Sequence, residues 1–316
     1  MLGAKAAYLA YRGGAAFANA IPAPVAEPVA ETIGRALGPV MAGRRRIVER
    51  NLRRATDGRL EGLALQRAVS DTFASYGRYW LELFRLPRDA RGSVESRFDA
   101  EGWEYIADAI AAGTGVILAL PHMGGFDFAA AWLAGRGAPP TVVVEPVEPP
   151  ELFEWFAGVR RAIGMEVVPL GPEAGGTILR ALRDNRPVCL LCDRDLVGDG
   201  VPVTFFGEET TMPAGPAVLA LRTGAPLLPV ASYFRPHGGH FAKIGPPLPV
   251  EREGILRDDV ARITQALAGR FEELVRMAPD QWHLMQPNWP SDRGEGEHPR
   301  ADRGEGEHPR ADRGDR

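Results

Sequence analysis

Short apolar runs alternate with amphipathic stretches through the middle of this chain. Six short runs are predicted as strands, and they lie at residues 116–120, 141–144, 166–170, 187–192, 226–233 and 240–244. Between and after them come stretches with helical spacing, at residues 103–112, 128–133, 152–163, 174–184, 212–222 and 258–277. Strands that alternate with helices are typical of a parallel sheet covered on both faces. The pattern therefore predicts an α/β fold of three layers, with a mostly parallel central sheet flanked by helices.

The two ends of the chain have different patterns. Residues 1–20 are rich in alanine, with a few large apolar residues, and a proline-rich break at 22–28 follows them. This predicts an N-terminal amphipathic helix within residues 1–24, which either lies on a bilayer or packs on the domain. Near the other end, the ten residues 292–301 are repeated, with almost no apolar content. We therefore expect one folded domain over residues 25–290 and a disordered tail over residues 291–316.

Charge is unevenly distributed along the chain. The formal net charge is −4 at pH 7, which gives no reason to expect a nucleic acid partner. Residues 1–54, however, hold nine Lys or Arg residues against three Glu, so this part could face an anionic membrane surface. The longest early uncharged run, residues 13–26, is shorter than the roughly 20 residues that a membrane span needs. We therefore expect no transmembrane helix.

The two cysteines, Cys189 and Cys192, form a C-x-x-C sequence inside the predicted strand 187–192. Side chains three positions apart on a strand point to opposite faces of the sheet. The two thiols would therefore bridge poorly, and the sequence holds no second cysteine pair to complete a zinc site. We interpret both cysteines as core residues, expect no bound metal, and place the chain in a reducing compartment.

The strongest candidate for catalysis follows the first predicted strand. His122 comes directly after Pro121, Gly124 and Gly125 follow, and Asp127 precedes the next predicted helix. Open α/β sheets bind ligands at the carboxyl ends of their strands, and glycines allow close approach of a backbone or a ligand. An imidazole oriented by a carboxylate can act as a general base near neutral pH. The alternative interpretation is a histidine in a polar surface turn.

A basic helix is predicted at residues 44–54, with Ile47, Asn51 and Leu52 on one side. Its many arginines form either a solvated face or a set of contacts to phospholipid headgroups or other phosphate groups, which match the fork geometry of arginine. The sequence pattern leaves both interpretations open.

Several motifs, in this order, resemble one protein family. The spacing His-x4-Asp of His122 and Asp127 is a hallmark of glycerolipid acyltransferases. Other stretches resemble the branch that holds lipid A lauroyl acyltransferases and bacterial phosphatidylinositol mannoside acyltransferases, namely residues 46–52, 76–80, 193–196, 205–207, 212–216, 222–225 and 279–283. The stretches between residues 193 and 216 look more like the mannoside enzymes than the lipid A enzymes.

The resemblance implies a glycerolipid acyltransferase-like fold and a peripheral enzyme on the cytoplasmic face of the cell membrane. It implies transfer of a fatty acyl chain from acyl-CoA, or from acyl carrier protein, to a sugar hydroxyl of a membrane glycolipid, here a mannose of phosphatidylinositol mannoside. Acyl-CoA would be a co-substrate, and no cofactor is expected. A lipid A-like or lysophospholipid acceptor, a non-catalytic relative that binds acyl-CoA or lipid, and a hydrolase are the alternatives.

In such an enzyme His122 would be the general base, and Asp127 would hold its other ring nitrogen. Backbone N–H groups near Gly124 and Gly125, or the guanidinium of Arg194, would stabilise the oxyanion. Because the sequence has no G-x-S-x-G motif and neither cysteine has a histidine nearby, we expect direct transfer without an acyl-enzyme.

Three charged residues at or near the later predicted elements complete the candidate site. Glu145 is expected to position the sugar, and Arg160 and Arg194 are expected to bind substrate. For each there is an alternative interpretation. Arg194 could instead pair with Asp193 or Asp195, Arg160 could be a solvated helix residue, and Glu145 could be inert.

Overall fold

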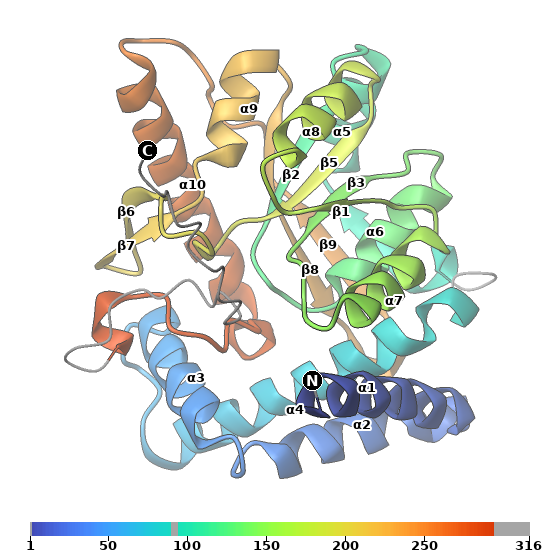
Figure 1. Ribbon diagram of the computed structural model, residues 1–316. Coiled ribbons are helices and arrows are strands. Elements are labelled where there is room, and N and C mark those ends of the chain that lie inside the picture. The colour runs from blue at the N-terminus through green and yellow to red at the C-terminus, as the bar shows by residue number, and fades with distance from the viewer. Residues whose placement is uncertain (1, 90–93, 294–316) are drawn as a thin grey trace, which may run out of the picture.

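The computed structural model describes residues 2–89 and 94–293. Its centre is a seven-stranded sheet with the order β1-β9-β8-β2-β5-β3-β4 (Figure 1). The strands are β1 (Phe98–Glu101), β2 (Val116–Leu120), β3 (Thr141–Val144), β4 (Glu166–Pro169), β5 (Pro187–Leu191), β8 (Leu227–Phe234) and β9 (His240–Ile244). Neighbouring strands are parallel except β8 and β9, which are antiparallel. The predicted mostly parallel sheet is therefore confirmed.

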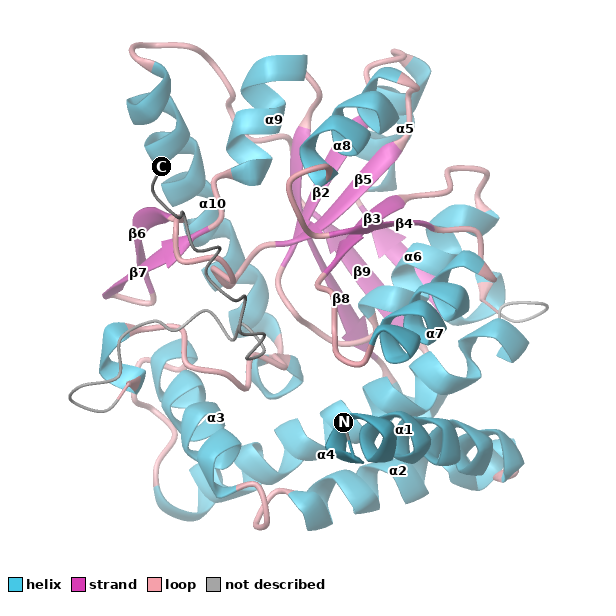
Figure 2. Ribbon diagram, viewed as in Figure 1, coloured by secondary structure: helices cyan, strands magenta, loops and turns pink. Residues whose placement is uncertain are grey.

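Helices cover both faces of this sheet (Figure 2). One face packs against α8 (Ala174–Arg183), α9 (Gly215–Thr223) and α10 (Leu256–Met277), and the other packs against α5 (Trp103–Ala111) and α6 (Phe126–Gly135). On β2, Ile117 and Ala119 belong to the first of these cores, whereas Leu118 and Leu120 belong to the second. A strand that is buried on both faces reads as a continuous apolar run. The three predicted layers are confirmed.

The N-terminal helices form a further layer below the sheet in Figure 1. They are α1 (Leu2–Ala20), α2 (Ala23–Leu37), α3 (Ala42–Ala55) and α4 (Gly62–Asp89), and α7 (Pro150–Arg161) packs against α4. The backbones of α2 and α4 touch, because a Cβ atom on Gly77 would lie 2.3 Å from the backbone oxygen of Ala30. The ring of Tyr11 on α1 lies 5.3 Å from the ring of Trp80 on α4. The first helix is therefore packed on the domain.

Three features differ from the sequence-based expectation. The short strand β1 and the hairpin of β6 (Val201–Phe205) and β7 (Glu208–Met212) are absent from the predicted strands. Helix α2 begins at Ala23, inside the predicted proline break. Its Pro24 lies in the first turn, where a backbone N–H has no helical partner in any case.

The folded part also extends slightly beyond the predicted boundary at residue 290. Ser291 and Asp292 make hydrogen bonds to α3 and to the preceding loop, so they belong to the domain. The rest of the predicted tail, residues 294–316, lies outside the described residues. Within residues 2–89 and 94–293, no helix combines the length and the apolar character that crossing a bilayer requires.

Candidate active site

His122 lies two residues after the end of β2, and its ring lies against a buried carboxylate. Its Nδ1 is 2.6 Å from Oδ1 of Asp193, and its backbone N–H donates to Oδ2 of the same side chain at 3.0 Å. Asp193 follows β5, which is the parallel neighbour of β2, so the carboxyl ends of the two strands bring the residues together. The prediction that Asp127 holds this ring nitrogen is therefore wrong.

Asp193 has no solvent exposure, and several neighbouring groups donate hydrogen bonds to it. Nε1 of Trp282 donates to its Oδ2 at 2.9 Å, and Nδ2 of Asn288 donates to its backbone oxygen at 3.1 Å. Burial disfavours the charged carboxylate, but the charge of His122 and the hydrogen bonds from His122 and Trp282 outweigh it and lower the pKa of Asp193. Because an ionised carboxylate only accepts hydrogen bonds, the proton between the two side chains is on Nδ1 of His122.

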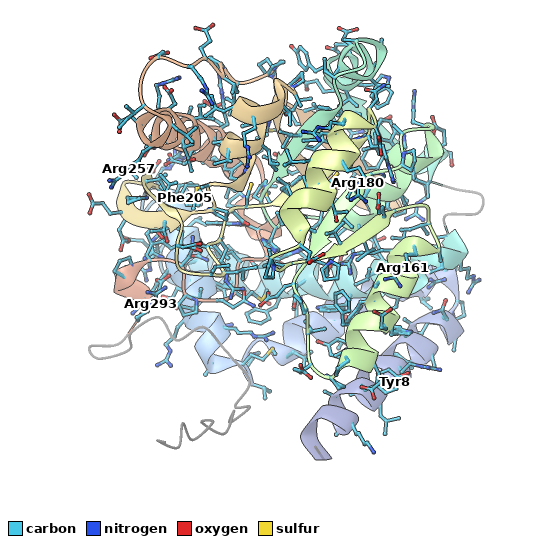
Figure 3. All side chains as sticks on the ribbon, turned by 45° about the horizontal axis from the view of Figure 1, so that its top comes forward. Tyr8, Arg161, Arg180, Phe205, Arg257 and Arg293 are labelled. Carbon is cyan, nitrogen blue, oxygen red and sulfur yellow. The ribbon has the colours of Figure 1, made fainter. Side chains whose placement is uncertain are left out.

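Asp127 lies in the first turn of α6 and has other partners. The guanidinium of Arg160 on α7 binds it with two hydrogen bonds, of 2.7 and 2.9 Å, and the hydroxyl of Tyr79 on α4 donates to it at 3.0 Å. Burial alone would lower the pKa of Arg160, but the charge of Asp127 raises it above its ordinary value. Arg160 is therefore not a solvated residue, unlike Arg161, which lies on the exposed face of α7 (Figure 3).

A cavity of about 650 Å³ opens beside His122. Its apolar walls come from the sheet and from helices α5 and α6, through residues such as Phe98, Ile106, Leu118, Trp132, Val230 and Ile244. Charged side chains border another part of it, namely Asp127, Glu145, Arg160, Arg194, Asp195 and Asp199. An apolar cavity with a few converging polar groups is the usual form of a small-molecule or lipid site.

Comparison with known proteins identifies the family. The sequence model of the bacterial lipid A biosynthesis acyltransferases matches residues 4–291 of this chain. The chain belongs to this family. A phosphatidylinositol mannoside acyltransferase of Mycolicibacterium smegmatis is 37% identical over 309 residues, which make up 95% of this chain and 96% of that protein. A protein of the same name from Mycobacterium tuberculosis H37Rv is 43% identical over 229 residues, 70% of each chain. The resemblance indicated by the motifs is confirmed.

Gly124 and Gly125, which follow His122 in this acyltransferase, allow close packing against neighbouring residues. Gly124 has φ +51°, and a Cβ atom there would lie 2.4 Å from the backbone oxygen of Ser232. A Cβ atom on Gly125 would lie 3.0 Å from ring atoms of His240. The N–H of Gly124 donates to the backbone oxygen of Gln281 at 3.0 Å. This N–H is therefore already engaged, which contradicts its predicted role as an oxyanion donor.

Arg194 and Glu145 border the cavity of this acyltransferase, as the sequence-based hypothesis requires. The carboxylate of Asp195 accepts hydrogen bonds from the backbone N–H groups of the following loop and from the hydroxyl of Thr211. Among the residues that the structure describes, no ion pair joins Arg194 to Asp193 or to Asp195. The alternative of a structural pair for Arg194 is therefore not found in the structure.

Sequence reasoning missed a second histidine at the site. His283 lines the cavity, its backbone N–H donates to the backbone oxygen of His122 at 2.8 Å, and its Nε2 is 2.8 Å from the hydroxyl of Ser75. Burial, together with the nearby His122, lowers the pKa of His283 to about 3. This histidine is therefore neutral at physiological pH and a weak base. The sequence signal that could have identified His283 is its place in the family-like motif at residues 279–283, which also holds Trp282.

Both cysteines lie in the core, as predicted. Cys189 packs on the α5–α6 side of the sheet and Cys192 on the opposite side. Neither forms a disulfide, and burial raises the pKa of Cys189 to about 12. Burial is also the main cause of the raised pKa of Cys192. Since the thiolate is the nucleophilic form, neither side chain is suited to covalent catalysis.

Proposed function

We propose that this acyltransferase transfers a fatty acyl chain from acyl-CoA to a mannose hydroxyl of a phosphatidylinositol mannoside. The observation that carries the proposal is the pair of His122 and buried Asp193, set beside an apolar cavity of about 650 Å³. The names of the mycobacterial relatives support the acceptor. The apolar part of the cavity suits an acyl chain, and its charged border suits a sugar and a phosphate.

The geometry supports general-base catalysis by Nε2 of His122. As the mannose hydroxyl attacks the thioester carbon, Nε2 takes its proton, and Asp193 stabilises the imidazolium that forms. The tetrahedral intermediate then collapses, the carbon–sulfur bond breaks, and the CoA thiolate leaves and recovers a proton from His122. We assign oxyanion stabilisation to Arg194, because it borders the cavity and the Gly124 N–H is engaged elsewhere.

Direct transfer fits this site better than a covalent intermediate. Ser75 is hydrogen-bonded to His283, but a histidine with a pKa of about 3 is too weak a base to activate a serine near neutral pH. The buried cysteines have raised pKa values, which disfavour the nucleophilic thiolate.

Glu145 is exposed at the end of β3 and borders the cavity, where its carboxylate would accept hydrogen bonds from sugar hydroxyls.

Peripheral binding to the cytoplasmic face of the membrane is part of the same proposal. The N-terminal helices and their connections expose several large apolar side chains, namely Leu9, Phe17, Val25, Ile33, Leu37, Val40 and Leu63. Exposed arginines of α3, including Arg44 and Arg46, add positive charge. Apolar side chains beside basic ones suit an anionic lipid surface.

The proposal is tested by incubating the full chain with radiolabelled palmitoyl-CoA and one of three acceptors: phosphatidylinositol mannosides, lipid A precursors or lysophospholipids. We expect labelled mannoside product from the wild type and a loss of about 10²-fold or more for His122→Ala. Undiminished transfer by His122→Ala would remove the general-base role. Release of CoA without an acylated product would show a hydrolase, and label confined to another acceptor would reassign the substrate.

A further inference from the structure

Helix α3 contacts the C-terminal segment through Arg50, Asn51 and Arg54, and neither interpretation of the basic helix explains these contacts. Asn51 is buried, and its Nδ2 donates to the backbone oxygen of Leu284 at 2.8 Å. Arg54, one turn further on, donates from Nη1 to Oδ1 of Asn51 at 3.2 Å and so fixes the orientation of the amide. Arg50 and Arg53 on the same helix are exposed. Arg54 therefore faces the protein, and neither solvent nor a phosphate group accounts for it.

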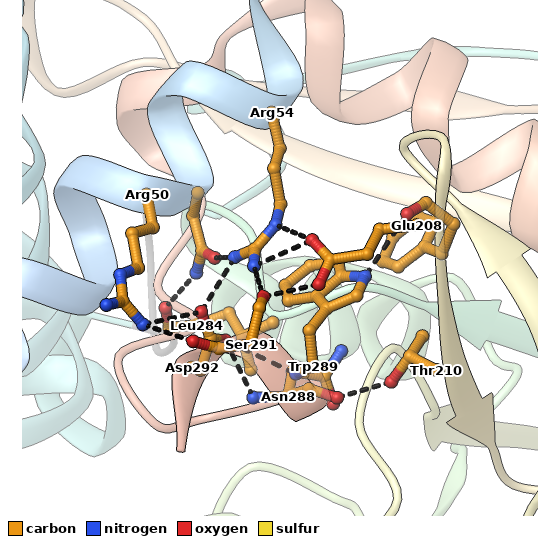
Figure 4. Close-up of polar contacts among 11 residues, drawn as sticks. Arg50, Arg54, Glu208, Thr210, Leu284, Asn288, Trp289, Ser291 and Asp292 are labelled. Carbon is orange, nitrogen blue, oxygen red and sulfur yellow. Dashed lines mark hydrogen bonds and ion pairs between the residues drawn. The ribbon is translucent and has the colours of Figure 1, made fainter. Parts of the chain in front are cut away.

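The guanidinium of Arg54 joins three parts of the fold (Figure 4). It is 2.9 Å from Oε2 of Glu208, at the start of β7, and 2.9 Å from Oδ1 of Asp292. It also lies 4.0 Å from the centre of the Trp289 ring. The side chain of Asp292 has no solvent exposure. A buried carboxylate needs a charged partner. Arg54 supplies the closer one, at 2.9 Å and largely buried, with the fork geometry that lysine lacks, whereas the exposed Arg50 lies 3.6 Å from the same oxygen.

Asp292 is linked to Asp193 by hydrogen bonds through Asn288. Its Oδ2 accepts the backbone N–H of Asn288 at 3.1 Å, and the side chain of Asn288 donates to the backbone oxygen of Asp193 at 3.1 Å. Trp282, which donates to the carboxylate of Asp193, stands at the other end of the same segment. Between them, Leu284 is held by α3. Trp282 and Asn288, which bond to Asp193, thus lie on a segment that α3 contacts at Leu284 and at Asp292.

We propose that Arg54 is a positioning residue for the pair of His122 and Asp193, acting through Asp292 and Asn288. This rests on the proposed function, in which Asp193 orients His122 as the base. Misplacing a catalytic group by about 1 Å can cost on the order of 10²-fold in rate. Arg54 is not among the residues that line the cavity, so its loss changes the chemical step more than substrate binding.

The test compares Arg54→Gln with Arg53→Gln, a matched control on the same helix that loses only an exposed pair with Glu49. We expect Arg54→Gln to lower kcat by about tenfold or more, with KM for palmitoyl-CoA and for the mannoside changed by less than about twofold. We also expect the deshielded Nδ1 proton resonance of His122, observed by NMR, to broaden or shift. Arg53→Gln should leave kcat, KM and the resonance unchanged.

Arg54→Lys keeps the charge but cannot bind both carboxylates in the same way, so it should restore part of kcat. It also decides the question if Arg54→Gln does not fold: a folded Arg54→Lys with wild-type kcat and an unaltered His122 resonance overturns the proposal. A fall in kcat without any change in that resonance overturns it as well. If the wild type acylates no acceptor, the proposed function fails, whereas the resonance comparison still decides the role of Arg54.

Discussion

At the scale of single residues, the site depends on which nitrogen of His122 carries the proton. Oδ2 of Asp193 accepts two N–H groups, from the backbone of His122 and from Trp282, while Oδ1 faces Nδ1. In Asp193→Asn, the amide oxygen would keep the two N–H donors, so the amide NH2 would face Nδ1. The proton would then move to Nε2, the nitrogen that must accept one. We expect kcat to fall by about 10³- to 10⁴-fold in transfer assays, with the fold retained.

Asp127→Asn is the matched control for that prediction. Asp127 has the same side chain and a similar burial, but its partners are Arg160 and Tyr79 and not His122. Its replacement should lower the midpoint of thermal unfolding and leave the pH profile of kcat unchanged. If Asp127→Asn abolished transfer while Asp193→Asn remained active, the assignment of the carboxylate partner would be reversed.

His283 gives the folded protein a pH dependence of its own. Burial, and then the charge of His122, lower its pKa from the ordinary value of 6.5 to about 3. Below pH 6.5 the unfolded chain therefore binds a proton here that the folded protein does not bind. The stability linked to His283 is complete above pH 6.5 and is lost progressively as the pH falls towards 3. At about 1.4 kcal/mol per pKa unit, roughly 3 kcal/mol is lost by pH 4.

Urea unfolding at pH 7 and pH 4 measures this effect. Other groups titrate over the same range, so the informative quantity is the difference between the wild type and His283→Gln, whose amide can still meet the hydroxyl of Ser75. The free energy of unfolding should fall by about 3 kcal/mol less in His283→Gln than in the wild type. Equal falls in the two proteins would show that His283 titrates normally in the folded state.

At the scale of elements, the ion pair of Arg160 and Asp127 joins α7 to the start of α6, and Tyr79 adds α4. Both charged side chains are largely buried, with 11% and 7% exposure. Arg160→Gln would leave a buried carboxylate without its charge partner, so we expect a loss of about 3–5 kcal/mol in the free energy of unfolding. Arg161→Gln, which removes only an exposed pair, should change it by less than about 0.5 kcal/mol. Similar small losses in both would mean that water reaches Asp127.

The elements show which parts of the fold a sequence pattern can predict. Strands β2, β3 and β9 have their predicted bounds. β2 and β3 are apolar or β-branched runs that end at a change of pattern, whereas β9 reads His-Phe-Ala-Lys-Ile and alternates in burial. The hairpin of β6 and β7 was missed, since β7 reads Glu-Glu-Thr-Thr-Met and the contacts of β6 with α10 and Trp289 are not visible in the sequence. Polar short strands are defined by such distant contacts more than by propensity.

The same limit explains the error at the site. His122 could be found because it lies just after a buried strand. Its partner was assigned to Asp127, five residues away, whereas Asp193 lies 71 residues further along the chain. The rule that the ends of parallel strands meet in space applies to Asp193 as well. It can be used only once β2 and β5 are known to be neighbouring strands. That strand order follows from the whole sheet and not from the local pattern.

At the scale of the whole molecule, the exposed apolar residues of the N-terminal helices form the proposed membrane surface. Leu9 and Phe17 on α1 are 67% and 55% exposed, while Ala18 and the ring of Tyr11 pack the same helix onto α4. The helix is thus held by one face and presents the other. Removing residues 1–20 would uncover the core beneath, so point substitutions give the cleaner test.

Leu9→Ser combined with Phe17→Ser should weaken flotation with phosphatidylinositol-containing vesicles. Burying one large apolar side chain contributes about 1.5–3 kcal/mol, so losing two should reduce the bound fraction by about tenfold or more at limiting lipid. Ile255→Ser is the matched control, because Ile255 is 66% exposed but precedes α10. Added salt should also weaken binding of the wild type, because it screens the attraction between the arginines of α3 and the anionic lipid. If the double variant and the control floated equally well with the vesicles, the membrane would have to meet another face of the protein.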